Sequence, residues 1–451
     1  MLPRILIVIV LLLLLIGMAN SRRLLRIDLT AYGLFLGAFY FLFVPALLFL
    51  FTGTLSIPLL ARIDMADQDA NLAILIAYLL GLGAIFLISG IVKSRMRPRP
   101  EQKKQLVLSA EWMIYVVSIL AYFALSIFIL RASGVTSGGH WYLAKADYLE
   151  AAGTLGVISL YSIWGLRLLI VSFTFELLSR KTISYTFALV VTTAVCLYEL
   201  LYVGNRIVVL MFGMAGLMYI FVQHGRRALV LTLLAILPLA LGLAVYQDVR
   251  YMLFSATPLR MLEAIFNILG GRHSAFSDVF TSSFLKVFEH ADFVVMLNVF
   301  GMAGSTLELL NGSTLLKTIV WFIPRSLWPG KPESITVVVG QLFLPGSRVS
   351  LVPLVFGEFH LNFGILGILF FPFFLFLVLS LIKAVTRRIP LHNYLNFLAG
   401  FLLFRLPISD ILIAVIMAAL IYQGFGFAVR RIWRPVPYEP LPRYALKKQT
   451  S

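Results

Sequence analysis

The sequence predicts an all-α, polytopic integral membrane protein of about eleven transmembrane helices. Of its 451 residues, 61% are hydrophobic and only 13% are charged, and the mean hydropathy is +0.96. Soluble domains are far less apolar and carry more charge, so this composition is typical of a membrane-embedded chain. Most of the apolar residues fall into runs of roughly 20, the length that a helix needs to cross hydrocarbon while pairing its own backbone amides.

The apolar runs divide the chain into four parts. A transmembrane bundle of about eight helices is predicted over 1–246, a large loop over 247–362, about three further helices over 363–429 and a polar tail over 430–451. The predicted spans are, in order, Ile5–Ala19, Leu29–Phe51, Leu72–Val92, Trp112–Leu130, Leu155–Phe175, Tyr185–Val203, Ile207–Val222, Ala228–Tyr246, Phe363–Ile382, Tyr394–Phe404 and Ile411–Val429.

The first span has an alternative interpretation as a cleaved signal peptide. Only Arg4 precedes its apolar run, three arginines follow it, and no A-x-A-like cleavage site occurs before Ser21. A signal peptide has the opposite charge arrangement and a small-residue cleavage site. An uncleaved first helix is therefore favoured.

The links between the spans alternate in charge. One set of links, with the C-terminal tail, carries 22 Lys and Arg residues, whereas the opposite set carries six outside the large loop. Cation-rich loops face the cytoplasm, which predicts a cytoplasmic C-terminus, a periplasmic N-terminus and a large periplasmic loop. The excess of 37 basic over 20 acidic residues therefore reflects topology. Nucleic-acid binding is not expected, because no basic stripe is interleaved with stacking aromatic residues.

Two apolar stretches, Phe293–Leu310 and Leu315–Trp328, lie inside the large loop. If either crossed the membrane alone, the alternation of the later basic links would invert. They are therefore predicted to be amphipathic or re-entrant helices, which lie on the outer surface or pack into the bundle.

Arginines on the outer side are candidates for binding a lipid-linked phosphate, because the planar guanidinium donates two hydrogen bonds at once to phosphate oxygens. Arg206 follows Gly204 in a short outer turn between two spans, and Arg325 and Lys331 frame a segment with three prolines. The structural alternatives are a snorkelling Arg206 and a rigid interfacial turn with solvated charges. The remaining candidates are Arg250, Arg348 and Arg405, the last with an Arg405–Asp410 ion pair as its alternative.

Glu358, His360 and Asn362 stand where the large loop re-enters the membrane. Polar groups there are costly unless they are paired, which predicts either a pocket or a set of helix anchors. In a pocket, Glu358 or His360 can accept a proton from a hydroxyl group. If the segment is helical, Glu358 and Asn362 share a face.

Several signatures are absent from the sequence. It contains no HExxH, Walker, GxSxG or DxD-type motif, one cysteine and six dispersed histidines. Neither a metal site nor a cofactor is expected from this pattern.

Three segments resemble the Wzy-type polymerases of polysaccharide repeat units. They are the turn Gly204-Asn205-Arg206, the segment FIPRSLWPGKPE from Phe322 to Glu333, and GEFHLNFGILGI from Gly357 to Ile368, which precedes Arg405 and Asp410. The resemblance implies a GT-C-like fold in the bacterial inner membrane and a metal-independent glycosyl transfer on its periplasmic face. A growing O-antigen-type glycan would leave undecaprenyl pyrophosphate and join a new lipid-linked unit.

The resemblance also implies roles and partners. Arg206 and Arg325 would bind the pyrophosphate with help from Arg348 and Arg405, and Glu358 or His360 would orient or deprotonate the acceptor hydroxyl. Lys331 and Arg250 are further substrate-binding candidates. The expected partners are the lipid-linked oligosaccharide, membrane lipid, a chain-length regulator and a flippase.

Three other functions stay open at this point. An O-antigen ligase would use the same donor and transfer the glycan to lipid A core. A flippase or transporter of lipid-linked sugars needs a polar path across the bilayer, for which the spans offer few ionisable groups, Arg167, Glu176 and Glu199. A structural partner in an export complex would keep its activity without the outer arginines.

Overall fold

The computed structural model describes residues 29–57, 61–64, 68–94, 108–132, 141–224, 290–323, 327–345, 350–389 and 392–432. Within these ranges the regular secondary structure is helical apart from one isolated bridge and a short antiparallel hairpin of β1 (Thr54–Ile57) and β2 (Ala61–Asp64), which was not predicted. The predicted spans Ile5–Ala19 and Ala228–Tyr246 lie outside the described residues, as do Arg250, Arg325 and Arg348.

The described helices follow the predicted spans closely. In the first half they are α3 (Leu29–Ala38), the π-helical η1 (Phe39–Phe43), α4 (Val44–Thr52), α5 (Asp69–Ser94), α6 (Leu108–Ala132), α7 (Trp141–Ser179), α8 (Tyr185–Tyr198), the π-helical η3 (Glu199–Val203) and the helix Ile207–His224. In the second half they are α12 (His290–Met302), α13 (Ser313–Val320), α14 (Ile335–Phe343), α15 (Leu354–Phe363), α16 (Leu366–Thr386), α17 (His392–Leu403) and α18 (Ile408–Ile432).

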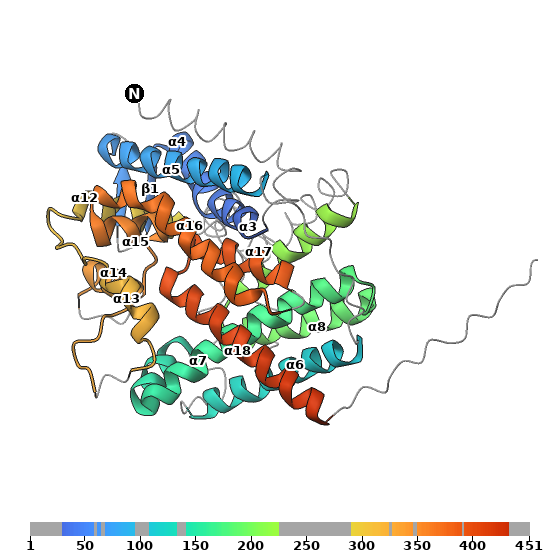
Figure 1. Ribbon diagram of the computed structural model, residues 1–451. Helices are drawn as coiled ribbons and strands as arrows, with labels where there is room; N and C mark the ends of the chain where they lie inside the picture. Colours follow the sequence, from blue (N-terminus) through green and yellow to red (C-terminus); the bar gives the residue numbers. More distant parts are fainter. Residues whose placement is uncertain are drawn as a thin grey trace, which may run out of the picture.

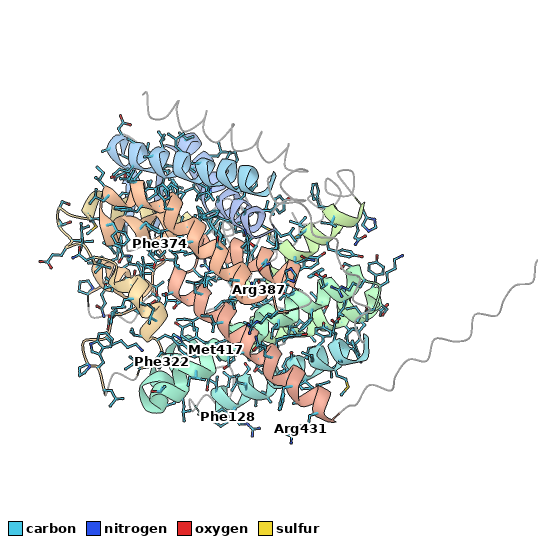
Figure 2. The ribbon with its side chains drawn as sticks, viewed as in Figure 1. Phe128, Phe322, Phe374, Arg387, Met417 and Arg431 are labelled. Carbon is cyan, nitrogen blue, oxygen red and sulfur yellow. The ribbon has the colours of Figure 1, made fainter. Side chains whose placement is uncertain are left out.

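Six helices of the described part are long and apolar enough to cross a membrane: Leu29–Leu50, Ala110–Ala132, Ala152–Ser179, Ile207–His224, Leu366–Thr386 and Ile408–Val429. Their outward faces are apolar too. Phe128 on α6 is 60% exposed (Figure 2) and Phe373 on α16 is 70% exposed. Rings this exposed are stable against lipid rather than water. The prediction of a helical, polytopic membrane protein is confirmed at this level.

The centre of the bundle is a close crossing of α3 and α17. A Cβ atom added at Gly33 would lie 1.9 Å from the Phe397 carbonyl oxygen, and one added at Gly400 would lie 2.0 Å from that of Thr30. Each helix therefore presents bare backbone to the other. Small residues permit such contact between membrane helices, where dispersion and close packing drive association.

The two apolar stretches of the large loop lie in different places. The first forms α12, whose residues Phe293 to Leu297 are fully buried and which packs against α15 and α5. The second forms the short α13, which packs against the start of α18 at the side of the bundle (Figure 1). Of the two arrangements predicted for these stretches, α12 adopts the one packed into the bundle.

Candidate functional site: a cationic cavity at one end of the bundle

A cavity of about 510 Å³ lies between α7, the start of the helix Ile207–His224, α13 and the junction of α17 with α18. This volume is within the range of small-molecule binding sites. The described side chains that line it include four cations, two carboxylates and three aromatic rings, namely Arg206, Lys317, Lys331, Arg405, Asp292, Asp410, Tyr161, Trp164 and Trp321. Three of the predicted candidates, Arg206, Lys331 and Arg405, therefore meet around one cavity.

Arg206 is placed by the turn that precedes its helix. Gly204 ends η3 with a φ of +71°, a left-handed conformation that glycine adopts without a steric penalty. The Asn205 side chain then accepts the N–H of Ile207 at 3.1 Å, as a helix N-cap does. The half-buried Arg206 thus stands at a helix N-terminus, where the peptide dipoles add to its positive charge.

Arg405 is held by the opposite wall. Its Nε donates to Asp292 Oδ2 at 2.8 Å, and its guanidinium lies 5.8 Å from the centre of the Phe41 ring. The alternative, an Arg405–Asp410 ion pair, is not the arrangement found, because Asp410 bonds to Lys317 and Tyr161 instead. The bond to Asp292 fixes the guanidinium without removing it from the cavity lining.

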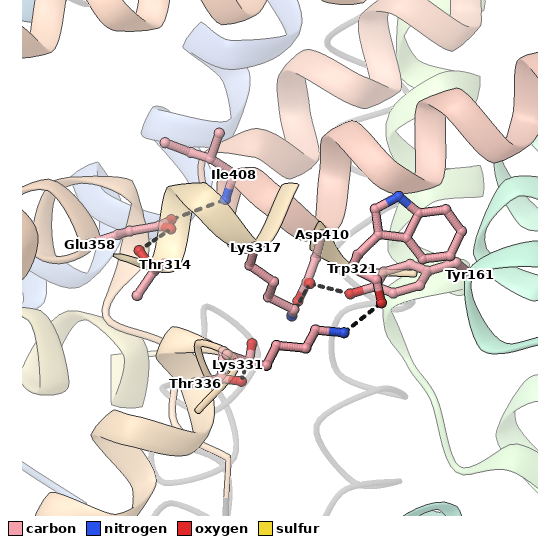
Figure 3. A network of polar contacts seen from close by, with 10 residues as sticks. Tyr161, Thr314, Lys317, Trp321, Lys331, Thr336, Glu358, Ile408 and Asp410 are labelled. Atoms are coloured by element: carbon pink, nitrogen blue, oxygen red, sulfur yellow. Dashed lines mark hydrogen bonds and ion pairs between the residues drawn. The ribbon is translucent and has the colours of Figure 1, made fainter. Parts of the chain in front are cut away.

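Lys331 caps the C-terminal end of α13. Its ammonium donates to the carbonyl oxygens of Trp321 at 2.6 Å and Ile323 at 2.8 Å, the first of these contacts being visible in Figure 3. Carbonyl groups at a helix C-terminus lack intrahelical donors and carry partial negative charge. Lys331 therefore fastens the proline-rich segment to α13 and adds positive charge to the cavity.

Asp410 is the centre of a polar group that was not predicted. Its Oδ1 accepts hydrogen bonds from Lys317 Nζ at 2.7 Å and from the Tyr161 hydroxyl at 2.6 Å, and all three side chains converge in Figure 3. The Tyr161 ring also contacts the edge of the Trp321 ring at 5.6 Å between centroids. The cavity wall thus combines a carboxylate, a cation and aromatic rings within one cluster.

Glu358 lies behind the wall rather than in it. It is 1% exposed, and its carboxylate accepts the N–H of Ile408 at 3.0 Å and the hydroxyl of Thr314 at 3.3 Å. Glu358 therefore caps the first amide of α18, on the same α15 face from which Asn362 Nδ2 also donates to Thr314. Burial raises the pKa of Glu358 to about 7, although the hydrogen bond from Ile408 opposes the shift.

His360 points to another side of α15, into an aromatic cluster. Its ring lies 5.1 Å from that of Phe300 and 6.2 Å from that of Tyr78. Burial lowers its pKa below the ordinary value, which a hydrogen bond with the Phe300 backbone opposes. Neither His360 nor Glu358 is among the described residues that line the cavity.

The geometry defines a membrane-embedded helical protein with a cationic, aromatic cavity at one end of its bundle. Such a lining can bind an anion beside a group with a flat apolar face. Within the described ranges no group of three His, Cys, Asp or Glu side chains is placed to hold a metal ion. Comparison with protein-family models, curated proteins and solved structures finds no match for this chain.

Proposed function

We propose that this protein is a glycosyltransferase that polymerises lipid-linked oligosaccharide repeat units at the periplasmic face of the bacterial inner membrane. The observation that carries the proposal is the meeting of Arg206 and Arg405, nearly 200 residues apart in sequence, around one cavity with Lys317 and Lys331. The proposal includes the GT-C-like architecture of about eleven spans and a metal-independent reaction.

The reaction breaks the bond between the anomeric carbon of the growing glycan and undecaprenyl pyrophosphate, and forms a bond from that carbon to a hydroxyl of the incoming unit. As the new bond forms, the hydroxyl proton passes to the Asp410 carboxylate that lines the cavity, and the pyrophosphate leaves with the electrons of the broken bond. Fixed cations stabilise the charge that develops on the leaving group. Arg206 and Arg405 have this role in the proposal, together with Arg325, Arg348 and Arg250 from outside the described residues.

The other cavity residues suit the sugar. Tyr161, Trp164 and Trp321 offer ring faces and edges against which a pyranose can pack. Asp410 lines the cavity and is oriented by Lys317 and Tyr161, so the proposal gives it the contact with the acceptor hydroxyl.

Glu358 acts through the start of α18 in this proposal, because its carboxylate caps Ile408, two residues before Asp410. It is therefore a positioning residue. His360 has no contact with the reacting groups in this arrangement.

The proposed orientation follows from charge. The cavity lies at the end of the bundle formed by the links around residues 204–206 and 404–410, which belong to the cation-poor set. The basic links around residues 180–181 and 387–388 follow the C-terminal ends of α7 and α16, and neither link lines the cavity. Because cation-rich links stay in the cytoplasm, the cavity is assigned to the periplasmic side.

The test is polymer synthesis by purified full-length protein with a defined lipid-linked repeat unit. Arg206→Ala and Arg405→Ala are each expected to lower turnover by about a hundredfold, with Arg325→Ala beside them. Arg387→Ala is the matched control, since Arg387 is an exposed arginine that follows the C-terminal end of α16 and is not part of the cavity lining. Full turnover in both cavity variants would contradict the proposal.

The same assay separates polymerase from ligase. A polymerase elongates the glycan on its lipid carrier, whereas a ligase with the same donor site transfers it to added lipid A core. If product forms only on lipid A core, the donor site proposed here stands, but the acceptor is lipid A core instead of a new lipid-linked unit. Transbilayer movement of the substrate in vesicles without any new glycosidic bond would instead indicate a transporter.

A further inference from the structure

A closed ion pair lies behind the cavity wall, inside the membrane-spanning region. Arg167 on α7 donates from Nε and Nη2 to the two carboxylate oxygens of Glu199, at 2.5 and 2.9 Å. Tyr122 on α6 donates a further hydrogen bond to the same carboxylate. Arg167 is 4% exposed and Glu199 is fully buried. Ionisable groups at such depth are expensive to keep and are typically tied to function.

One connection runs from this pair to the aromatic part of the cavity. Trp164 lies one turn before Arg167 on α7 and lines the cavity. Its ring is 4.9 Å from the guanidinium carbon of Arg167, a cation–π contact in an apolar setting. The Arg167 guanidinium therefore packs against the Trp164 indole, and Glu199 holds the guanidinium in place.

A second connection runs to the cationic part. Glu199 is the first residue of the π-helical turn η3, and its carbonyl oxygen accepts the N–H of Asn205 at 2.9 Å. The Asn205 side chain then accepts the N–H of Ile207, the first residue of the helix that Arg206 precedes. Short π-helical turns inside helices occur frequently at functional sites, and here the turn sets the direction in which the chain leaves the membrane before Arg206.

We infer that Arg167 and Glu199 are positioning residues, which hold Trp164 and Arg206 at a fixed separation for a sugar linked to a diphosphate. The inference rests on the proposed function for the identity of the ligand. Trp164 stands on α7 and Arg206 lies in the turn that follows η3, and the two-pronged bond between Arg167 on α7 and Glu199 at the start of η3 ties these two segments together. A site held in its binding geometry loses less conformational freedom when the ligand arrives.

The test measures binding of farnesyl pyrophosphate, with farnesyl monophosphate for comparison, to the full-length protein in lipid nanodiscs. Arg167→Met/Glu199→Leu removes both charges together and so leaves none unpaired. We expect about tenfold weaker binding of the pyrophosphate probe. In the Arg206→Ala background the same pair change has no further effect, because this probe carries no sugar to contact Trp164 and the pair acts on its pyrophosphate through Arg206. A residue with a merely structural role would weaken binding by the same factor in both backgrounds.

Glu176→Gln is the matched control, because Glu176 is a buried carboxylate on the same helix α7, as little exposed as Arg167 at 4%, and bonded to Arg180 away from the cavity. It is expected to bind the probe as the wild type does. Thermal unfolding and size-exclusion chromatography check the fold of each variant. If the pair variant does not fold, Tyr122→Phe takes its place, with about threefold weaker binding expected, and again none of it in the Arg206→Ala background.

The outcomes separate the two ideas. If the wild type fails to bind the pyrophosphate probe, the proposed function is wrong and the inference is lost with it. If the wild type binds and Arg206→Ala weakens binding, but the folded pair variant binds at full strength, only the inference is overturned. A further tenfold loss on adding the pair change to Arg206→Ala would overturn it as well.

Discussion

Two groups of arginine and glutamate lie along α7, and they differ in how completely they are paired. Behind the cavity, Arg167 and Glu199 make two hydrogen bonds and both are buried. Near the C-terminal end of α7, Arg180 is 34% exposed and lies 3.2 Å from Glu176 and 3.9 Å from Glu111. In the described part of the chain, Glu176 Oε2 and Glu111 Oε1 are buried without a hydrogen bond.

The difference shows which of the two groups fixes a geometry. A two-pronged bond in an apolar interior leaves the guanidinium and carboxylate one relative orientation, and neither group can exchange its partner for water. A half-open arginine at the end of a helix is screened and has several rotamers at similar energy. The closed pair of Arg167 and Glu199 is therefore suited to aligning the cavity. The open group around Arg180 instead marks the end of α7, where the apolar span stops.

The largest expected effect comes from breaking the closed pair on one side. Glu199→Leu leaves the Arg167 charge buried without its partner, which is expected to lower the free energy of unfolding by about 3–5 kcal/mol. Arg167→Met/Glu199→Leu should recover most of that loss, because no charge is then left unpaired. Chemical denaturation in detergent micelles measures both. A single variant as stable as the double would show that the pair is not closed as described.

A smaller effect is expected from pH at the buried carboxylate behind the cavity. The pKa of Glu358 is raised from 4.5 to about 7, so its protonated form is favoured by folding. Its contribution to stability is complete below pH 4.5, falls as the pH rises, and is lost above pH 7, by about 3 kcal/mol in total. Comparing the wild type with Glu358→Gln, which stays neutral, isolates this term. Parallel pH curves for the two proteins would contradict it.

The fold was predictable as far as it follows from the length of apolar runs. Spans such as Trp112–Leu130 and Phe363–Ile382 correspond to α6 and α16 because a membrane helix is defined by composition over a long window. The β1–β2 hairpin was not, since its strands have four residues each and too short a pattern to separate from the end of a span.

The site was predictable only in part, for a related reason. Arg206 could be identified because a lone cation in a tight turn between two apolar runs is locally unusual. The pairing of Lys317 with Asp410, 93 residues further along the chain, depends on how α13 packs against α18, and no local pattern encodes that contact. Glu358 was recognised as important, but a polar residue at a helix mouth can serve either a ligand or a neighbouring helix. Its bond to Ile408 shows the second use.

The smallest effect is expected from the open group, and it completes the comparison. Glu176→Gln removes one charge from the neighbourhood of Arg180, whose exposure of 34% lets water and salt compensate. We expect the free energy of unfolding to change by less than about 1 kcal/mol, and the difference to shrink further in high salt. Denaturation at two salt concentrations, beside Glu199→Leu, measures it. A loss as large as that of Glu199→Leu would mean that burial of the carboxylate, and not the completeness of its pairing, decides what these ion pairs contribute.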